Sequence, residues 1–260
     1  MGWMRYVMAG AAFAAPMSAA AAETGALVRF VACPVYRDTD SGRKSGCWLA
    51  QDRASGTRYD VSLSPHKPDW NYAVLVEGKV SAEAPTACGS PVLAPVRTSR
   101  LYDMPCTRHM LPAEGFAGRR YKLPRRNISP SSVARPVPPG PYAERVFPVY
   151  FEYGNDFLIY QYDDWLIDQA VTWIQAAKPA RLIITGYAAT QPETVSGVTI
   201  AEPESLALQR AQTIATTMER MVPGLKIEVR ADTHPAVTQE AEADGLPWQS
   251  QRRVEMRAVF

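Results

Sequence analysis

The residue types most often used in catalysis are scarce in this chain of 260 residues. It has three histidines, His66, His109 and His234, and none accompanies a nucleophile motif such as G-x-S-x-G. A hydrolytic triad needs a nucleophile, a base and an orienting acid within hydrogen-bond reach, and no stretch supplies that pattern. No glycine-rich phosphate loop occurs either. We therefore expect a protein that is not an enzyme, with no catalytic residues and no cofactor.

Two patterns resemble metal sites only in part. The run Asp38-x-Asp40-x-Gly42 is similar to the start of a calcium loop, but the remaining ligands are missing, so a tight turn is expected. The four cysteines lack the C-x-x-C spacing that is typical of zinc sites, and His66 and His109 stand at no ligand-like offset. The sequence therefore predicts no metal site.

The four cysteines, Cys33, Cys47, Cys88 and Cys106, all lie in the first half of the chain. Disulfides persist in oxidising compartments, so two bridges are expected if the protein is exported. Four cysteines allow three connectivities, and the sequence alone does not choose among them. We favour Cys33–Cys47 with Cys88–Cys106, because each of these pairs closes a short loop between neighbouring extended segments.

Residues 1–22 have the pattern of a secretory signal peptide. Arg5 supplies the positive start, Val7–Ala15 is a short apolar stretch, and Ala19–Ala22 offers small residues for cleavage. The stretch is too short for a membrane span, which needs about 20 apolar residues. Cys33 lies too far downstream for a lipoprotein anchor. We expect export by a cleaved signal peptide to a bacterial periplasm, and association with the outer membrane stays open.

A proline-rich segment, residues 129–142, divides the rest of the chain into two domains. Clustered prolines disfavour both helix and central strand, so an extended linker is expected. The net charge of +2 for the whole chain hides a difference across this segment: residues 23–128 carry +6 and residues 129–260 carry −5. The near-neutral total argues against a nucleic-acid partner. The predicted domains are residues 24–128 and 143–260.

The first domain is expected to be all-β, a small barrel that could be OB-like. Short β-branched or aromatic runs alternate with turn residues, and the expected strands are 27–33, 47–51, 58–63, 73–80 and 91–96. A basic run follows them, and its members are Arg119, Arg120, Lys122, Arg125 and Arg126. We interpret this run as a solvated surface, with contact to an anionic surface as the other reading. An unidentified envelope protein is the expected partner of this domain.

The second domain alternates strand and helix patterns. Apolar residues recur at helical spacing in 163–177 and 203–221. The expected strands are 146–153, 181–185, 225–231 and 252–259. This order, β-α-β-α-β-β, predicts a mixed sheet with both helices packed on it, and the whole chain is then an α+β protein.

Four short runs in this second half resemble the motifs of the OmpA-like family, the peptidoglycan-binding domains of the bacterial envelope. The runs are VYFEYGN at 149–155, RLIITGY at 181–187, LALQRA at 206–211 and QRRVEM at 251–256. They are similar to that family's V-Y-F-x-F-x-S start, its strand that ends in G-H-T-D, its L-S-x-x-R-A helix and its N-R-R-V-E-I close. They occur in the family's order, whereas the first half resembles no known family.

The resemblance implies a site for the diaminopimelate of the peptidoglycan peptide stem. In the family an aspartate binds the ammonium group and a helix arginine binds the carboxylate, for which a guanidinium fork is well suited. The helix arginine corresponds to Arg210. One residue of the closing pair Arg252 and Arg253 is expected to line the same pocket, and Gly186 and Tyr187 are expected at its edge. The other reading of Arg210 is an internal ion pair.

The chain departs from the family's motif at two positions. Ala189 stands where the family has its aspartate, and Pro203 stands where it has an asparagine before the helix. The separation between Ala189 and Arg210 is also longer than in the family, so Thr190–Glu204 is expected to be an inserted loop. The missing negative charge could come from this loop, which contains Glu193, Glu202 and Glu204.

Two functions follow as hypotheses. The first is a non-catalytic periplasmic protein that associates with peptidoglycan through a diverged OmpA-like domain. The second is a structural subunit of an envelope or secretion assembly whose OmpA-like domain has lost peptidoglycan binding.

Overall fold

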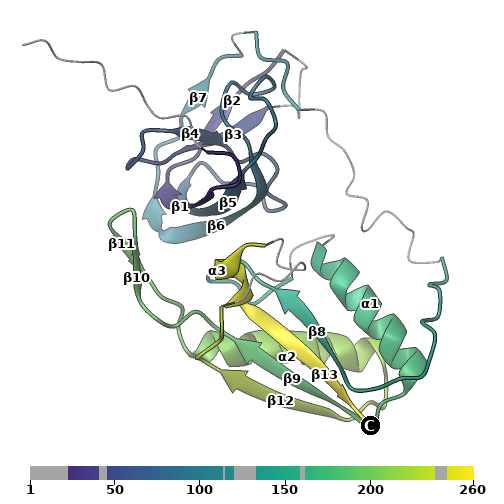
Figure 1. Ribbon diagram of the computed structural model, residues 1–260. Helices are drawn as coiled ribbons and strands as arrows, with labels where there is room; N and C mark the ends of the chain where they lie inside the picture. The colour runs from purple at the N-terminus through teal and green to yellow at the C-terminus, as the bar shows by residue number, and fades with distance from the viewer. Residues whose placement is uncertain (1–22, 41–45, 114, 120–132, 159–161, 238–244) are drawn as a thin grey trace, which may run out of the picture.

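The computed structural model describes residues 23–40, 46–113, 115–119, 133–158, 162–237 and 245–260. The predicted signal peptide, residues 1–22, lies outside these ranges. The described chain has an all-β N-terminal half and a C-terminal half of strands and helices (Figure 1). The α+β class predicted from the sequence is confirmed.

Two sheets form the N-terminal half. The first is antiparallel and has the order β1-β5-β6, with β1 at Leu27–Ala32, β5 at Tyr72–Val80 and β6 at Leu93–Pro105. The second has the order β4-β3-β2-β7, with β4 at Arg58–Asp60, β3 at Cys47–Gln51, β2 at Val35–Arg37 and β7 at Met110–Leu111. Within the described residues these strands do not close into the barrel that the sequence suggested.

The central strand β5 is apolar on both of its faces. Val74 and Val76 pack into the core between the two sheets, whereas Ala73 and Leu75 belong to a second cluster on the other face. Side chains alternate across a strand, so a strand that is buried on both sides needs a continuous apolar run. This explains why β5 contains so few polar residues.

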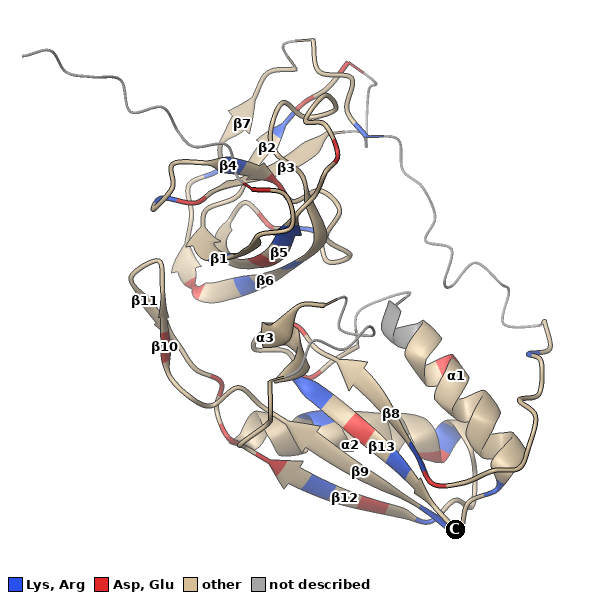
Figure 2. Ribbon diagram, viewed as in Figure 1, with Lys and Arg blue, Asp and Glu red and all other residues tan. Residues whose placement is uncertain are grey.

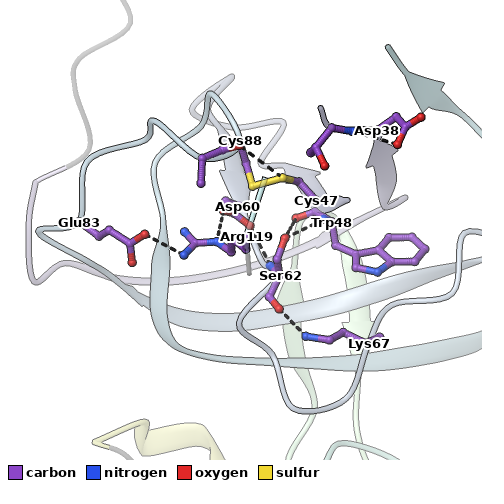
Figure 3. The surroundings of a disulfide bond; sticks show 11 residues. Asp38, Cys47, Trp48, Asp60, Ser62, Lys67, Glu83, Cys88 and Arg119 are labelled. Atoms are coloured by element: carbon purple, nitrogen blue, oxygen red, sulfur yellow. Dashed lines mark hydrogen bonds and ion pairs between the residues drawn. A yellow bond between two sulfur atoms is a disulfide. The ribbon is translucent and has the colours of Figure 1, made fainter. Parts of the chain in front are cut away.

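Two disulfides fasten the N-terminal half, and the predicted pairing is wrong. Cys33 pairs with Cys106. Cys47 pairs with Cys88, and this second bridge is the one drawn in Figure 3. Cys33 follows β1 and Cys106 follows β6, which are the two outer strands of the first sheet. The bridge therefore spans a sequence separation of 73 residues. The prediction paired cysteines that lie close together in the sequence. It failed because the order of strands in the sheet determines which segments of the chain become neighbours.

Arg119 is the one described member of the basic run. Its Nε donates to Asp60 Oδ2 at 2.9 Å and its Nη1 donates to Glu83 Oε1 at 2.7 Å (Figure 3). Asp60 is fully buried, so Arg119 serves as its counter-ion. Arg120, Lys122, Arg125 and Arg126 lie outside the described residues.

The C-terminal half is a four-stranded mixed sheet with two long helices. Its sheet has the order β12-β9-β13-β8, with β12 at Ile227–Asp232, β9 at Arg181–Tyr187, β13 at Arg253–Val259 and β8 at Arg145–Tyr150. The helices are α1 at Tyr162–Ala177, α2 at Ser205–Met221 and the short α3 at Pro247–Ser250. β12 and β9 are parallel, and β13 is antiparallel to both of its neighbours.

One face of this sheet carries the core. Leu182 and Ile184 of β9 pack with Ile214 and Met218 of α2 in a cluster that also includes residues of α1. The other face is more polar, and Figure 2 shows alternating basic and acidic bands along β13. The predicted mixed sheet with both helices packed on it is confirmed. Among the described residues, no helix has the length and apolar character to cross a bilayer.

A β-hairpin occupies the inserted segment Thr190–Glu204, which the sequence analysis expected to be a loop. Its strands are β10 at Glu193–Val195 and β11 at Val198–Ile200. The two turn residues, Ser196 and Gly197, have φ of 51° and 78°. Positive φ at both central positions is the requirement of a type I′ turn, which matches the twist of paired strands.

The hairpin reaches from the C-terminal half to the N-terminal half (Figure 1). Ser196 Oγ at its tip accepts a hydrogen bond of 3.0 Å from the amide of Val31 in β1. Val195 and Ile200 join the cluster on the outer face of β5. The insertion is therefore a docking element between the halves.

Buried ion pairs also connect the two halves. The guanidinium of Arg252, from the C-terminal half, donates to both carboxylate oxygens of Glu77 in β5. Arg97 of β6 donates to Glu152 Oε1 at 3.4 Å. All four side chains are at most 3% exposed. Their charges lie within the interface, so separation of the halves would expose them or leave them unpaired.

The proline-rich segment is described from residue 133 to 142 and has neither helix nor strand there. Arg135 Nε donates to Asp168 Oδ2 of α1 at 2.7 Å. The ring of Tyr142 packs edge-on against Trp173 of α1, with 5.6 Å between centroids. This part of the linker is thus fastened to the C-terminal half.

Candidate functional site

Arg210 lies in the middle of α2 and has no exposed surface. Its Nε donates to the carbonyl of Asn155 at 2.8 Å, and Nη1 donates to the carbonyl of Tyr187 at 2.9 Å. Nη2 donates to the carbonyl of Glu152 at 3.3 Å. The two remaining N–H groups donate to the carboxylate of Glu202, at 2.8 and 2.6 Å. All five donors of this guanidinium are therefore used within the chain.

The carboxylate of Glu202 is bound by N–H donors of Arg210 and of two backbone amides. Besides the two bonds from Arg210, its Oε1 accepts from the amide of Gly154 and its Oε2 from the amide of Ala189, each at 2.8 Å. Burial would raise the pKa of Glu202, but the charge and hydrogen bonds of Arg210, with Arg252 and the Gly154 amide, bring this pKa below its usual value. The carboxylate is therefore held in its ionised form.

The structure identifies the acidic residue of the inserted segment Thr190–Glu204 that faces Arg210. The sequence left Glu193, Glu202 and Glu204 open, and the structure places Glu202 there. Arg210 binds a carboxylate, as the resemblance implies, but that carboxylate belongs to the same chain and leaves no donor for an external ligand. The amide of Glu202 also donates to the carbonyl of Ala189 at 2.9 Å, so the ion pair closes the base of the hairpin.

Gly186 positions Arg210 by letting α2 approach β9. A β-carbon at Gly186 would overlap the carbonyl oxygen of Ala207 in α2, so no other residue fits without displacement of the helix. Tyr187 follows Gly186, and its carbonyl accepts from Arg210 at 2.9 Å. The two residues expected at the pocket edge thus support the buried ion pair.

The side chain of Tyr187 belongs to a different group of contacts. Its ring lies beneath the guanidinium of Arg253, 4.4 Å from the centroid, and its hydroxyl donates to Glu255 Oε2 at 3.2 Å. Burial and then the charge of Glu255 raise the pKa of Tyr187. Arg253 donates in addition to Glu255 Oε1 at 2.8 Å and to the carbonyl of Ser250.

The prediction that one residue of the pair Arg252 and Arg253 lines a pocket with Arg210 is therefore wrong, because the three arginines lie in three places. Arg210 is paired with Glu202, Arg252 with Glu77 of the N-terminal half, and Arg253 with Glu255 of its own strand. From the predicted set, Arg210 and the amide of Ala189 bind the Glu202 carboxylate, and the carbonyl of Tyr187 accepts from Arg210.

Glu152 is a buried acid in which only one of the two carboxylate oxygens has a hydrogen-bond partner among the described residues. Its Oε1 accepts from Arg97, but its Oε2 is buried with no hydrogen-bond partner among the described residues. Burial raises the pKa of Glu152, and the charges of Arg97 and Arg252 offset this only in part. The ionised form is thus more costly in the folded chain than in the unfolded chain.

The raised pKa predicts a pH dependence that Glu152→Gln should remove. The folded chain binds this proton more tightly than the unfolded chain, so the contribution of Glu152 to the free energy of unfolding falls as pH rises above the carboxyl's ordinary value of 4.5. The wild type should therefore lose stability relative to Glu152→Gln between that pH and neutrality. Urea unfolding of both proteins over this pH range measures the difference, and a constant difference would contradict the prediction.

A cavity of about 240 Å³ lies beside Ala189, at the ends of β9 and β12. Thr190 and His234 line it from the C-terminal half, Glu193 lines it from the hairpin, and Arg29 lines it from β1. Arg210 is not among its lining residues. In the described part of the chain, no group of three or more His, Cys, Asp or Glu side chains has the arrangement of a metal site.

Sequence reasoning missed the residues that the N-terminal half contributes. The sequence analysis assigned no role to Glu77, Arg29 or Arg97. The one available signal was Glu77 itself, which interrupts the apolar run of β5 and is fully buried. A buried glutamate is rare unless it is paired, but the sequence could not name Arg252 as its partner.

No family model matches the chain, and no curated protein does. Among solved structures, the chain is similar to the OmpA-like domain of FopA1 from Francisella tularensis subsp. tularensis SCHU S4, with 21% identity and a TM-score of 0.33 over 44% of this chain and 71% of that chain. It is also similar to the cell wall anchor of the T6SS from Pseudomonas aeruginosa, with 21% identity and a TM-score of 0.32 over 45% of this chain and 81% of that chain. The first of these structures belongs to the family that the sequence motifs resemble.

Proposed function

We propose that this protein is a non-catalytic, exported envelope protein that associates with the peptide part of peptidoglycan. The four ordered motifs of its second half, which resemble the OmpA-like family, support this function. The two disulfides are consistent with an oxidising compartment such as the periplasm. The observation that carries the proposal is the cavity beside Ala189, which occupies the end of β9 where the family's motif places its ligand contact.

The manner of binding differs from the one that the resemblance implies. Arg210 has no donor left for a ligand, since Glu202 occupies its fork. A ligand would instead enter the neighbouring cavity, which is lined by residues of both halves and of the hairpin. Recognition therefore involves the docked two-domain protein rather than the C-terminal half alone.

Co-sedimentation with purified peptidoglycan sacculi tests this function. The mature wild-type chain should pellet with intact sacculi, and soluble stem peptides released from sacculi by an amidase should compete for it. The stem-free glycan strands from the same digestion are the matched control competitor, and they should leave pelleting unchanged. Competition by the glycan strands and not by the peptides would show that the peptide is not the ligand, and no pelleting with intact sacculi would contradict wall association.

A structural subunit of an envelope assembly is the second candidate. The occupied fork of Arg210 favours it, because an OmpA-like site that is saturated by its own glutamate has no evident external partner there. Absence of pelleting with sacculi, combined with retention in a membrane-associated complex of the native host, would support this function over the first.

A further inference from the structure

Strand β12 has one edge without a partner strand. It is the outermost strand of the C-terminal sheet, and among the described strands it pairs only with β9 (Figure 1). Its last four residues, from Val229 to Asp232, are exposed. An edge strand presents a row of N–H and C=O groups with which another strand can pair. This edge is therefore a candidate interaction surface.

Alternate residues of β12 present their backbone groups at the open edge. The carbonyl of Lys226, just before the strand, accepts from the amide of Leu182 at the β9 side, at 2.8 Å. The backbone groups of successive strand residues point to opposite edges, so the even-numbered residues of β12 bond to β9. The N–H and C=O groups of Ile227, Val229 and Ala231 therefore face outward.

The charges of this segment are complementary to themselves in the antiparallel direction. With its preceding lysine, β12 has the sequence K-I-E-V-R-A-D. When two copies pair with Val229 opposite Val229, Glu228 lies opposite Arg230 and Lys226 lies opposite Asp232. Residues opposite each other in an antiparallel pair have Cβ atoms about 4.5–5.5 Å apart, so these opposite charges can interact. The side chains of Glu228 and Arg230 are 42% and 54% exposed and thus accessible to a second copy.

The same register also satisfies the backbone. With Val229 at the centre, Ile227 lies opposite Ala231, so the residues that face the open edge exchange N–H···O bonds with one another. Val229, which is 37% exposed in the single chain, then packs against its own copy. A centre at Glu228 or at Arg230 would place that charged residue opposite itself, which is destabilising. Charge therefore selects the register centred on Val229.

We propose that β12 is a homodimer interface, at which a second copy of this chain adds its own β12 in antiparallel orientation. The two four-stranded sheets then form one continuous sheet, and the same surface is used by both copies, as a two-fold axis requires. Arg230 donates to Glu228 within the strand, which holds both side chains on the face where the charges of the second copy lie. The inference is independent of wall association.

Sedimentation velocity of the mature chain over a range of concentrations tests the dimer. The wild type should dimerise as its concentration rises, and dilution should return the monomer, so properties of the single chain are measured below this range. The charge reversals Glu228→Arg and Arg230→Glu should each weaken the dimer at least about tenfold, because like charges then lie opposite each other at two symmetric positions.

Two further samples separate loss of this interface from loss of the fold. The double variant Glu228→Arg/Arg230→Glu restores opposite charges, so its dimer should be about as strong as that of the wild type. An equimolar mixture of the two single variants should form a heterodimer, because each variant supplies the charges that the other needs. The mixture is decisive, since within each single variant the two side chains still repel each other.

Glu144→Arg is the matched control for the change in net charge. Glu144 is 56% exposed and precedes β8, which lies at the opposite edge of the sheet. This variant should dimerise like the wild type.

Three results would overturn the proposal. The first is a wild type that stays monomeric at high micromolar concentration. The second is a dimer that Glu228→Arg and Arg230→Glu leave as strong as Glu144→Arg does, because its interface would then lie elsewhere. The third is a mixture of the two single variants that stays monomeric.

Discussion

Replacement of Glu202 by glutamine is expected to lower the free energy of unfolding by about 3–5 kcal/mol, the range for removal of one partner from a buried ion pair. The substitution keeps the size of the side chain but removes the charge that faces Arg210. The side-chain amide of a glutamine would also place its N–H groups opposite another donor. That donor is either the guanidinium of Arg210 or a backbone amide, and in the wild type it donates to a carboxylate oxygen of Glu202. The arginine would remain buried without a counter-ion of its own.

Chemical denaturation followed by tryptophan fluorescence measures this loss. Glu204→Gln is the matched control, because Glu204 is exposed, stands two residues away and makes no capping hydrogen bond with its side chain; we expect a change of at most about 0.5 kcal/mol for it. A Glu202→Gln protein that is as stable as Glu204→Gln would show that the pair contributes no net stability.

The effect of Glu202 should also depend on pH with a definite sign. Its pKa in the folded chain lies below the ordinary value of 4.5, so the stabilisation is present above that value and is lost as pH falls through the folded pKa. The wild type and Glu202→Gln should therefore converge in stability in acid. This is opposite to the trend expected from Glu152, and the two variants together separate the contributions.

The second large effect is expected at the interface between the halves, from Glu77→Gln. Glu77 is fully buried and accepts from both Arg29 and Arg252. Loss of its charge leaves two arginines competing for one neutral oxygen, so we expect a loss of about 3–5 kcal/mol in the free energy of unfolding. Because the contact with Arg252 crosses the interface, the folded halves should also separate more readily than in the wild type.

Denaturation gives the stability change, and small-angle X-ray scattering of the folded variant gives the separation as a larger radius of gyration. Glu228→Gln is the control, since Glu228 is 42% exposed and pairs with the exposed Arg230 in the C-terminal half alone; surface pairs contribute about 0–1 kcal/mol. Glu77→Gln with the stability and radius of this control would mean that the buried pairs do not hold the halves together.

Both predictions concern the carboxylates that face arginines, and the family resemblance placed Arg210 and one residue of the pair Arg252 and Arg253 at a ligand site. In this chain Arg210 and Arg252 instead bind Glu202 and Glu77. One pair holds the base of the hairpin and the other holds the N-terminal half against the C-terminal half. The charged residues of the motifs thus position the elements around the cavity.

Local patterns predicted the secondary structure of this protein well. The helical spacing in 163–177 and 203–221 corresponds to α1 and α2, and the expected strand 47–51 coincides with β3. These patterns depend on the period at which apolar residues meet a core, which is 3.6 residues in a helix and two in a strand. The hairpin at Thr190–Glu204 was missed because its strands have three residues each, too few to show a period.

The sequence by itself therefore determined the order of the two long helices and of the four strands of the C-terminal sheet, and the position of Arg210 on a buried helix face. Only the tertiary structure decided the partners: Cys106 for Cys33, Glu202 for Arg210 and Glu77 for Arg252. The physical reason is that the spacing at which apolar residues face the core is a local property of the chain. The partner of a thiol or a charge depends instead on which strands become neighbours, and residues as far apart as Glu77 and Arg252 meet only once the two halves have docked.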